Sequence, residues 1–221
     1  QMDVDITILI ANYNKASLLG RAIRSCLGQL ILRTNIEIIV IDDCSTDDSL
    51  VRLSEFSDNV KILQNDVNMG IGAVSAHGLT IAKGRYFLRV DPDDYLSHSY
   101  CLVHKNLLDY NSEFAFSYSD LIEVDEKAIK TKEVSLRDQK VLYQHGAGVM
   151  FRTKVLRQIG GYDVSLRNAE DYDLLLRLKK AGYNGFHIPL PLYRYYRQAD
   201  SLTRRQDRSK FISLVEEKNN V

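Results

Sequence analysis

The stretch IEIIVIDDCSTDDS, residues 36–49, joins an apolar, β-branched run to a polar segment that can start a helix. Residues 36–42 are almost continuously apolar, as expected of a strand that is covered on both faces. The STDDS that follows offers hydroxyl and carboxylate groups, which cap helices and favour their positive ends. A covered strand that leads directly into a helix indicates a βαβ unit and therefore a parallel sheet.

The same alternation continues on both sides of this stretch. Short apolar runs predict three more strands, at 6–11, 60–65 and 86–90. Segments of helical periodicity predict helices at 18–30, 47–57, 71–83 and 98–110, with a further strand at 114–119. Strands that alternate with helices are typical of the α/β class, so we expect a mostly parallel sheet flanked by helices.

The second half of the sequence has a different character. Residues 122–140 are mostly charged and predict an exposed excursion, and from residue 146 the pattern is irregular except for helices expected near 153–159 and 171–181. No internal repeat or low-complexity linker divides the chain. We therefore expect one domain over residues 1–221, with a nucleotide-binding first half and a smaller, substrate-shaping second half.

Charge and cysteine content limit the class of protein. Basic and acidic residues both number 29 among 221, so the formal net charge is zero and offers no general attraction to nucleic acid or an anionic membrane. Cys26, Cys44 and Cys101 show no CxxC pairing, which argues against a disulfide framework or a zinc site. No apolar run approaches the roughly 18 residues of a membrane span, and no signal peptide is recognisable. A soluble cytoplasmic protein is expected.

Polar side chains follow three of the expected strands. Residues 12–14, residues 42–43 and the acidic group Asp91, Asp93 and Asp94 each come directly after an apolar run. Ligands of open parallel sheets bind beyond the carboxyl ends of the strands, so these groups would lie along one edge. Neither GxGxxG nor GxxxxGK[ST] follows the first strand, which argues against a dinucleotide-dependent dehydrogenase and a P-loop NTPase.

An edge rich in carboxylates attracts a hard cation. Mg²⁺ or Mn²⁺ held by one or two carboxylates and completed by phosphate oxygens would suit this composition. A single acidic cluster after a strand is more often a solvated turn or a helix cap. Three polar strand ends in one chain favour a binding site.

Four segments, taken in order, resemble the motifs of family 2 glycosyltransferases with the GT-A fold: residues 7–29, 36–49, 68–94 and 160–183. The resemblance spans about residues 5 to 200. It implies an inverting enzyme that uses Mn²⁺ or Mg²⁺ to move a sugar from a nucleoside diphosphate sugar, with uridine as the expected base, to an acceptor hydroxyl. It also divides the chain into a nucleotide-sugar-binding half at 1–97, an acceptor and catalytic half at 98–205, and a tail at 206–221.

The resemblance assigns donor-binding roles in the first half. Tyr13 would stack on the base, and Asp43 would accept a hydrogen bond from a base N–H. Ala11, where many relatives have proline, and Gly70 would belong to the same nucleotide-sugar site. Taken alone, Tyr13 could equally be an ordinary packing residue and Asp43 a helix cap.

The segment DPDD resembles the DxD motif of this family. The resemblance implies that Asp91 faces the ribose or base and that Asp93 holds the divalent metal between the two phosphates. An aspartate at either of the last two positions occurs among relatives, so Asp94 is the second choice as metal ligand.

Glu170 and Asp171 resemble the family's ED pair at the start of a helix. Asp171 is then the expected catalytic base, which takes the proton from the acceptor hydroxyl. Considered alone, the pair is explained equally by the favourable charge of acidic residues near a helix start. Together with Glu170, the small residues Gly146, Ala147 and Gly148 would line the acceptor and sugar pocket, where a ligand comes close to backbone.

Two departures from the family pattern concern ligands of the donor. Ser75 and Ala76 occupy positions where many relatives have Arg-Asn, so a phosphate or base contact is missing. Tyr196 stands where relatives have a tail histidine that helps to bind metal or diphosphate. This substitution predicts weaker metal binding.

Two other function classes compete with this interpretation. A nucleotidyltransferase shares the sheet and the acidic site but usually has a Gly- and Arg-rich first loop, which ANYNKAS at 11–17 lacks. A non-catalytic nucleotide-sugar or carbohydrate-binding module of a larger synthase is disfavoured by the joint presence of Asp43, Asp93 and Asp171. The expected acceptor is a glycan, a lipid-linked molecule or a protein, and a lipid-linked acceptor would bring the chain to the inner face of the membrane.

Overall fold

A computed structural model describes residues 3–30, 32–197 and 202–220, without the side chains of Gln144 and of 202–208. The first half alternates strands and helices as expected: β1 (Ile6–Asn12), α1 (Ala16–Leu27), β2 (Ile36–Asp42), α2 (Ser49–Ser54), β3 (Lys61–Gln64), α3 (Ile71–Ile81) and β4 (Tyr86–Val90). In this half the predicted strands are confirmed to within one residue at each end, and the helices begin and end within three residues of their predicted bounds. The strand predicted at 114–119 starts as expected but runs five residues further, to Val124.

The second half contains shorter helices and longer strands: β5 (Tyr95–Leu96), α4 (Tyr100–Tyr110), β6 (Phe114–Val124), β7 (Lys130–Val134), α5 (Gln139–His145), β8 (Val149–Arg152), α6 (Thr153–Gln158), α7 (Glu170–Lys180), β9 (Asn184–Tyr196) and α8 (Leu202–Asn219). Among the described helices, none has the length and apolar character needed to cross a membrane.

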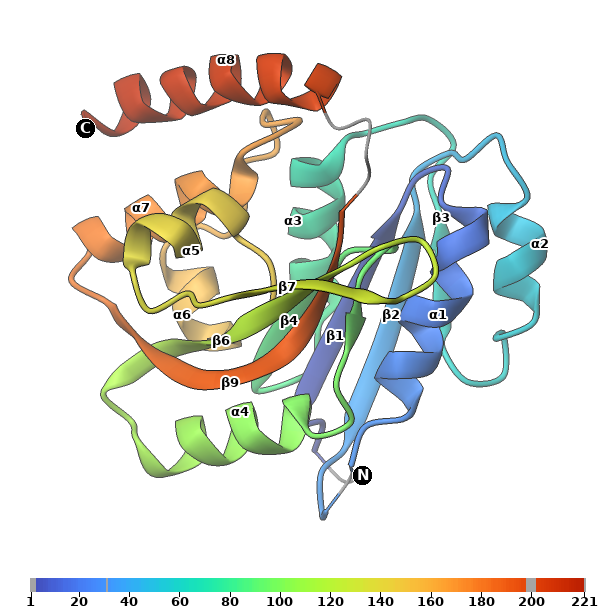
Figure 1. Cartoon of the computed structure of the whole chain (residues 1–221), viewed down its shortest axis with the longest axis horizontal. Helices are drawn as coiled ribbons and strands as arrows, with labels where there is room; N and C mark the ends of the chain where they lie inside the picture. Colours follow the sequence, from blue (N-terminus) through green and yellow to red (C-terminus); the bar gives the residue numbers. More distant parts are fainter. Residues whose placement is uncertain (1–2, 31, 198–201, 221) are drawn as a thin grey trace.

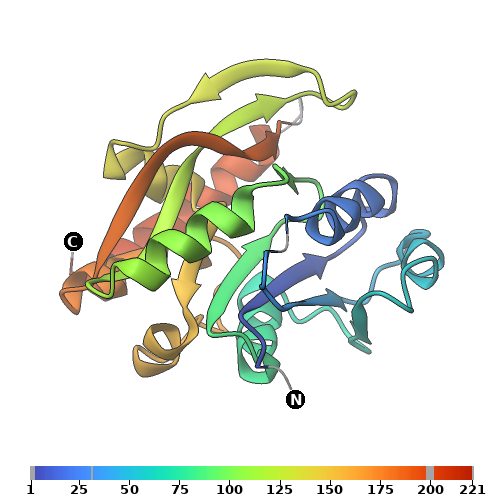
Figure 2. The same cartoon turned by 90° about the horizontal axis from the view of Figure 1, so that it is seen from below.

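Within the described residues the strands form one curled sheet in the order β3-β2-β1-β4-β8-β6-β9-β5, with β7 paired to β6 (Figure 1). The pairs β2–β3, β1–β2 and β1–β4 are parallel, as predicted for the first half. β4–β8, β6–β8, β6–β7 and β5–β9 are antiparallel. Seen from below, β6, β7 and β9 arch away from the strands of the first half (Figure 2).

The parallel strands form the core. All seven residues of β1 are buried, which explains why this stretch has no alternation of apolar and polar residues. α1 buries Leu19, Ala22 and Ile23 against the sheet, and Arg24 on its opposite face is exposed. Each fully buried large apolar side chain contributes about 1.5–3 kcal/mol, so this dense centre fixes the strand ends that follow it.

Two expectations for the second half need correction. Most of the segment 122–140 is exposed, as expected, but part of it belongs to the sheet, because β6 runs to Val124 and pairs with β7, and Leu136 is fully buried. The segment 184–196 is a single long strand, β9, although Pro189 and Pro191 make its sequence look irregular. Its pairing with β6 shifts register between Ser119 and Asp120, and this bulge accommodates the prolines.

Helix α8 packs on α7 through an apolar cluster of its own. Val215 is buried there against Leu166 and Leu176. Beside it, Asp173 of α7 accepts hydrogen bonds from Lys218 and Asn219 and forms an ion pair with Arg177 of its own helix. Asp173, for which no chemical role is predicted, therefore attaches the last helix to the domain.

Candidate active site

The three polar strand ends lie along one edge, as predicted, because β2, β1 and β4 are adjacent and parallel. Hydrogen bonds connect neighbouring ends directly. Asn12 donates from Nδ2 to Asp42 Oδ1 at 2.7 Å, and the Asp43 N–H donates to the Asn12 carbonyl at 2.8 Å. Asn14, in the left-handed region at φ 52°, accepts through Oδ1 from the Thr46 N–H at 2.8 Å. These contacts fix the loops after β1 and β2 relative to each other.

Asp43 is buried and holds the loop that precedes α3. Its Oδ1 accepts from Asn65 Nδ2 and from the Met69 N–H, and its Oδ2 accepts from the Gly70 N–H, each at 2.8 Å. Gly70 has φ 87°, and a Cβ there would lie 3.0 Å from Arg167 Cγ. In this structure Asp43 therefore organises the 65–70 loop, and its contact with a base stays a prediction.

Tyr13 and Lys15 follow β1 on the site edge. The Tyr13 side chain is about half exposed, which leaves a ring face accessible for stacking. Lys15 is mostly buried and its Nζ lies 2.7 Å from Asp93 Oδ2. Arg21 of α1 donates to the Asp93 carbonyl at 3.1 Å. Two cationic side chains of the first loop and helix thus hold the residue predicted to bind metal.

The three aspartates of the DPDD turn have different surroundings. Asp94 is buried and accepts from the Tyr193 hydroxyl at 2.8 Å and from the Tyr196 N–H at 2.7 Å. Burial and the neighbouring carboxylates of Asp91 and Asp93 raise the pKa of Asp94 well above its ordinary value. Asp94 therefore attaches the acidic turn to β9, and Asp93 remains the better candidate for a metal ligand.

Asp171 lies in the first turn of α7. The preceding Ala169 adopts a left-handed conformation with φ 59°, and its N–H donates to Asn168 Oδ1 at 2.7 Å. This turn directs Glu170 and Asp171 toward one guanidinium, that of Arg89 on β4. Glu170 Oε1 lies 2.7 Å from Arg89 Nη1, and Asp171 Oδ1 lies 2.9 Å from Arg89 Nη2. The expected acceptor-pocket residue Glu170 is thus buried in an ion pair.

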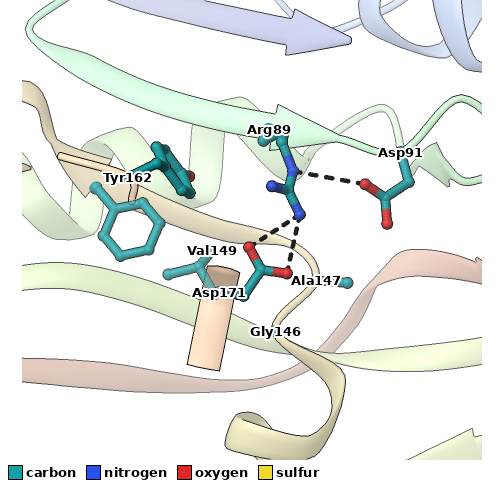
Figure 3. A pocket seen from close by; sticks show the side chains of 8 residues that line it. Arg89, Asp91, Gly146, Ala147, Val149, Tyr162 and Asp171 are labelled. Atoms are coloured by element: carbon teal, nitrogen blue, oxygen red, sulfur yellow. Dashed lines mark hydrogen bonds and ion pairs between the residues drawn. The ribbon is translucent and has the colours of Figure 1, made fainter. Parts of the chain in front are cut away.

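One narrow pocket brings the two halves of the chain together. Asp91 of the acidic turn and Asp171 of α7 line it, with Arg89 between them (Figure 3). Gly146 and Ala147 line it from the loop after α5. The third small residue, Gly148, faces Tyr193 instead, because a Cβ at this position would lie 2.6 Å from the tyrosine ring. Ala11, expected in the nucleotide-sugar site, is a buried residue of β1.

The carboxylates fit a divalent cation that takes few protein ligands. Arg89 and Lys15 contact Asp91, Glu170, Asp171 and Asp93, so negative charge exceeds positive charge. Among the described residues, no group of three or more His, Cys, Asp or Glu side chains is arranged to hold a metal. The excess of carboxylates fits a cation such as Mg²⁺, which needs only one or two of them and completes its coordination with water and phosphate oxygens.

Sequence reasoning missed Arg89 and Lys15. A signal for Arg89 was present, because one arginine interrupts an otherwise apolar strand, YFLRV at 86–90, and a buried cation requires carboxylate partners. Lys15 carried no comparable signal. A lysine one residue before a helix is ordinary, and its contact with Asp93 spans 78 residues of sequence.

Comparisons with known sequences place the chain among glycosyltransferases. The model of the family described as glycosyl transferase family 2 matches residues 7–160, and the match ends before Glu170. EpsE of Bacillus subtilis is 27% identical over 214 residues, which cover 90% of this chain and 76% of the relative. The poly(ribitol-phosphate) beta-N-acetylglucosaminyltransferase TarS of Staphylococcus aureus is 25% identical over 181 residues, 75% of this chain but only 30% of TarS.

Solved structures share the fold at lower identity. TarS in complex with UDP-GlcNAc superposes with a TM-score of 0.77 at 20% identity, over 96% of this chain and 65% of that one. A mannosyltransferase from Pyrobaculum calidifontis in complex with GDP-Man and Mn²⁺ gives a TM-score of 0.72 at 16% identity, over 95% and 61%. The chain thus has the predicted GT-A fold and spans less than two thirds of these structures.

Proposed function

This chain belongs to glycosyl transferase family 2, and we propose that it moves a sugar from a UDP-sugar to an acceptor hydroxyl, with inversion at the anomeric carbon. The observation that carries the proposal is that Asp91 of the acidic turn and Asp171 of α7 lie against the same guanidinium, that of Arg89. The half that would bind the donor and the half that would supply the base meet there, as a transfer between two substrates requires.

The donor would lie along the edge formed by the ends of β1, β2 and β4. The half-exposed ring of Tyr13 can stack on the base. Asp43 holds the 65–70 loop beside this position and has carboxylate lone pairs with which to accept from a uracil N–H. The proposal of uridine draws support from TarS, whose solved complexes contain UDP and UDP-GlcNAc.

Asp171 would act as the general base. As the acceptor oxygen attacks the anomeric carbon, its proton passes to the Asp171 carboxylate. A bond forms between the acceptor oxygen and the anomeric carbon, while the bond from that carbon to the diphosphate oxygen breaks with its electron pair. Attack from the side opposite the leaving group inverts the configuration.

Asp93 would hold the divalent cation, Mn²⁺ or Mg²⁺, and Lys15 would move off its carboxylate to make room. When bound, such a cation supplies positive charge that stabilises the departing diphosphate. Mn²⁺ in the complex of the Pyrobaculum mannosyltransferase supports this choice. Asp91 would contact the ribose.

The acceptor we propose is a growing glycan of a surface polymer, and the relation to TarS, named for transfer to poly(ribitol-phosphate), supports it. A lipid-linked or protein-linked glycan offers the same hydroxyl chemistry. Such an enzyme would act in the cytoplasm, at the inner face of the membrane when its acceptor is lipid-linked.

A donor panel tests the proposal. The protein is incubated with UDP-glucose, UDP-GlcNAc, GDP-mannose and dTDP-glucose, each with and without Mn²⁺, and its melting temperature and the release of nucleoside diphosphate are measured. A ligand at about 100 times its Kd adds about 2.7 kcal/mol to the free energy of unfolding, which a melting curve detects. A UDP-sugar with Mn²⁺ should give the largest shift and slow hydrolysis. If no nucleotide sugar stabilises the protein, the proposal is wrong.

Asp93→Asn extends the same measurement to the metal. The variant should lose the Mn²⁺-dependent part of the thermal shift. Asp58→Asn, at an exposed position after α2, is the matched control and should keep it. Equal Mn²⁺ responses in the two variants would reject Asp93 as the metal ligand.

A further inference from the structure

Arg89 contacts three carboxylates, two of which, Asp91 and Asp171, have a role in the proposed reaction. Besides its contacts with Glu170 and Asp171, its Nε lies 3.6 Å from Asp91 Oδ1 at the start of the acidic turn (Figure 3). Only 8% of its side chain is exposed. Burying a guanidinium costs several kcal/mol unless charged partners surround it, so these ion pairs are needed to keep Arg89 in place.

The guanidinium is held by the fold on its other sides as well. Arg89 is the last residue but one of β4, where its backbone pairs with Leu9 of β1. Its Nη1 donates to Ser75 Oγ of α3 at 3.0 Å, and the Tyr162 ring lies 5.7 Å from its Cζ. A residue larger than Ser75 would compete for this space. Strand, helix and ring together leave the guanidinium little freedom to move.

Asp171 is confined from two sides. Arg89 Nη2 contacts both of its carboxylate oxygens, each at 2.9 Å. On another side Gly146 approaches so closely that a Cβ there would lie 2.6 Å from Asp171 Cβ. The Arg89 guanidinium and the Gly146 backbone therefore hold the carboxylate where it lines the pocket.

We propose that Arg89 is a positioning residue of the transfer reaction, which orients the Asp171 carboxylate for proton abstraction. This inference rests on the proposed function, because it assigns Arg89 a role through the base. Arginine is required and lysine is not equivalent, since two guanidinium nitrogens contact the consecutive carboxylates of Glu170 and Asp171 at once. A single ammonium group lacks this fork.

The test compares Arg89→Met, Arg89→Lys and Arg177→Met in the hydrolysis of the donor that the panel identifies, with Mn²⁺ present. Arg177 is the matched control, because it also pairs with an acidic residue of α7, Asp173, and donates to the backbone carbonyl of Gly161. Arg89→Met should lower kcat about 100-fold, the effect of a catalytic group displaced by about 1 Å, while the KM for the donor stays the same. Arg89→Lys should recover part of kcat. Arg177→Met should lower the melting temperature but not kcat.

A double-mutant cycle separates positioning from a structural role. If Arg89 acts through the base, adding Arg89→Met to Asp171→Asn should cost less than twofold in kcat, although it costs about 100-fold in the wild-type background. Equal costs in both backgrounds would overturn the inference. A wild-type kcat in Arg89→Lys would also overturn the inference. If Arg89→Met does not fold, the kcat of Arg89→Lys decides the case. If Asp171→Asn itself hydrolyses the donor normally, the assignment of the base fails first, and the proposed function fails with it.

Discussion

The two halves of this domain are built by different rules, and the difference explains which parts of the site a sequence reveals. In the first half, β1 to β4 are parallel, and a helix connects each strand to the next. In the second half, β6 pairs with β7, β8 and β9, which lie as far apart in sequence as residues 130 and 196. Local pattern governs the first half, and long-range pairing governs the second.

The residues proposed to take part in the reaction are divided between the two halves in the same way. The first half contributes the edge that would bind the donor, and the second contributes Asp171 and the loop at Gly146. Arg89 lies on the last strand of the first half and contacts the first turn of α7 in the second. Variants that affect one half and spare the other test this division directly.

The largest effect is expected for Asp171→Asn. Without a base to take the proton, transfer or hydrolysis should fall by about 100- to 10,000-fold. Binding of the UDP-sugar with Mn²⁺ should stay the same, because it would depend on the first half. Measuring kcat together with the donor Kd checks the prediction, and loss of donor binding in this variant would break the division between the halves.

Gly146→Ala should have the next largest effect, because its new Cβ would displace Asp171. A displacement of about 1 Å at a catalytic group can cost about 100-fold in kcat. Gly160→Ala is the matched control, since Gly160 also has a positive φ, 88°, but a Cβ there meets nothing within 4 Å. Both variants should lose about 1–2 kcal/mol of stability, and only Gly146→Ala should lose activity. Equal kcat values would show that Asp171 tolerates the displacement.

His104 should give the second half a pH dependence. It is buried between α4 and β6, its Nδ1 lies 2.8 Å from Ser117 Oγ, and burial lowers its pKa to about 3. In the unfolded state the His104 imidazole takes up a proton below about pH 6.5, whereas in the folded state it stays neutral down to about pH 3. The free energy of unfolding therefore falls as the pH drops from 6.5 toward 3. The loss at pH 5 should be about 2 kcal/mol.

Urea unfolding at pH 7 and pH 5 measures this loss, which His104→Gln should remove. His77→Gln, at an exposed position on α3, should retain it. An unchanged pH dependence in His104→Gln would assign the loss to other groups.

The smallest effect is expected where α8 attaches. Lys218 Nζ lies 2.6 Å from Asp163 Oδ2, and this hydrogen bond, with that from Ser165, lowers the pKa of Asp163 to about 2. Stability from this contact is present above about pH 3.8 and is lost as the pH falls toward 2. Because Lys218 is nearly half exposed, Lys218→Met should cost less than about 1 kcal/mol in urea unfolding at pH 7. Lys210→Met on the same helix should cost less still, and the reverse order would contradict the assignment.

The positions of residues that depend on the strand they follow could be predicted, although their roles stay predictions. Asp43 and Asp93 come directly after apolar runs, and parallel strands necessarily bring such positions to one edge. Residues whose role depends on a distant partner could not be predicted. Asp94 cannot be told from Asp93 in the sequence, and it differs because β9 brings Tyr193 and the Tyr196 N–H to it across about a hundred residues.

The sequence by itself determined the class of fold, the edge of the sheet that carries the site and the family, because apolar periodicity and short motifs record local structure. Only the tertiary structure decided that Arg89 joins Asp91 to Asp171, that Lys15 holds Asp93, and that a proline-containing segment forms the long strand β9. The physical reason is that ion pairs and strand pairings between distant residues depend on positions in space, which a linear pattern does not contain.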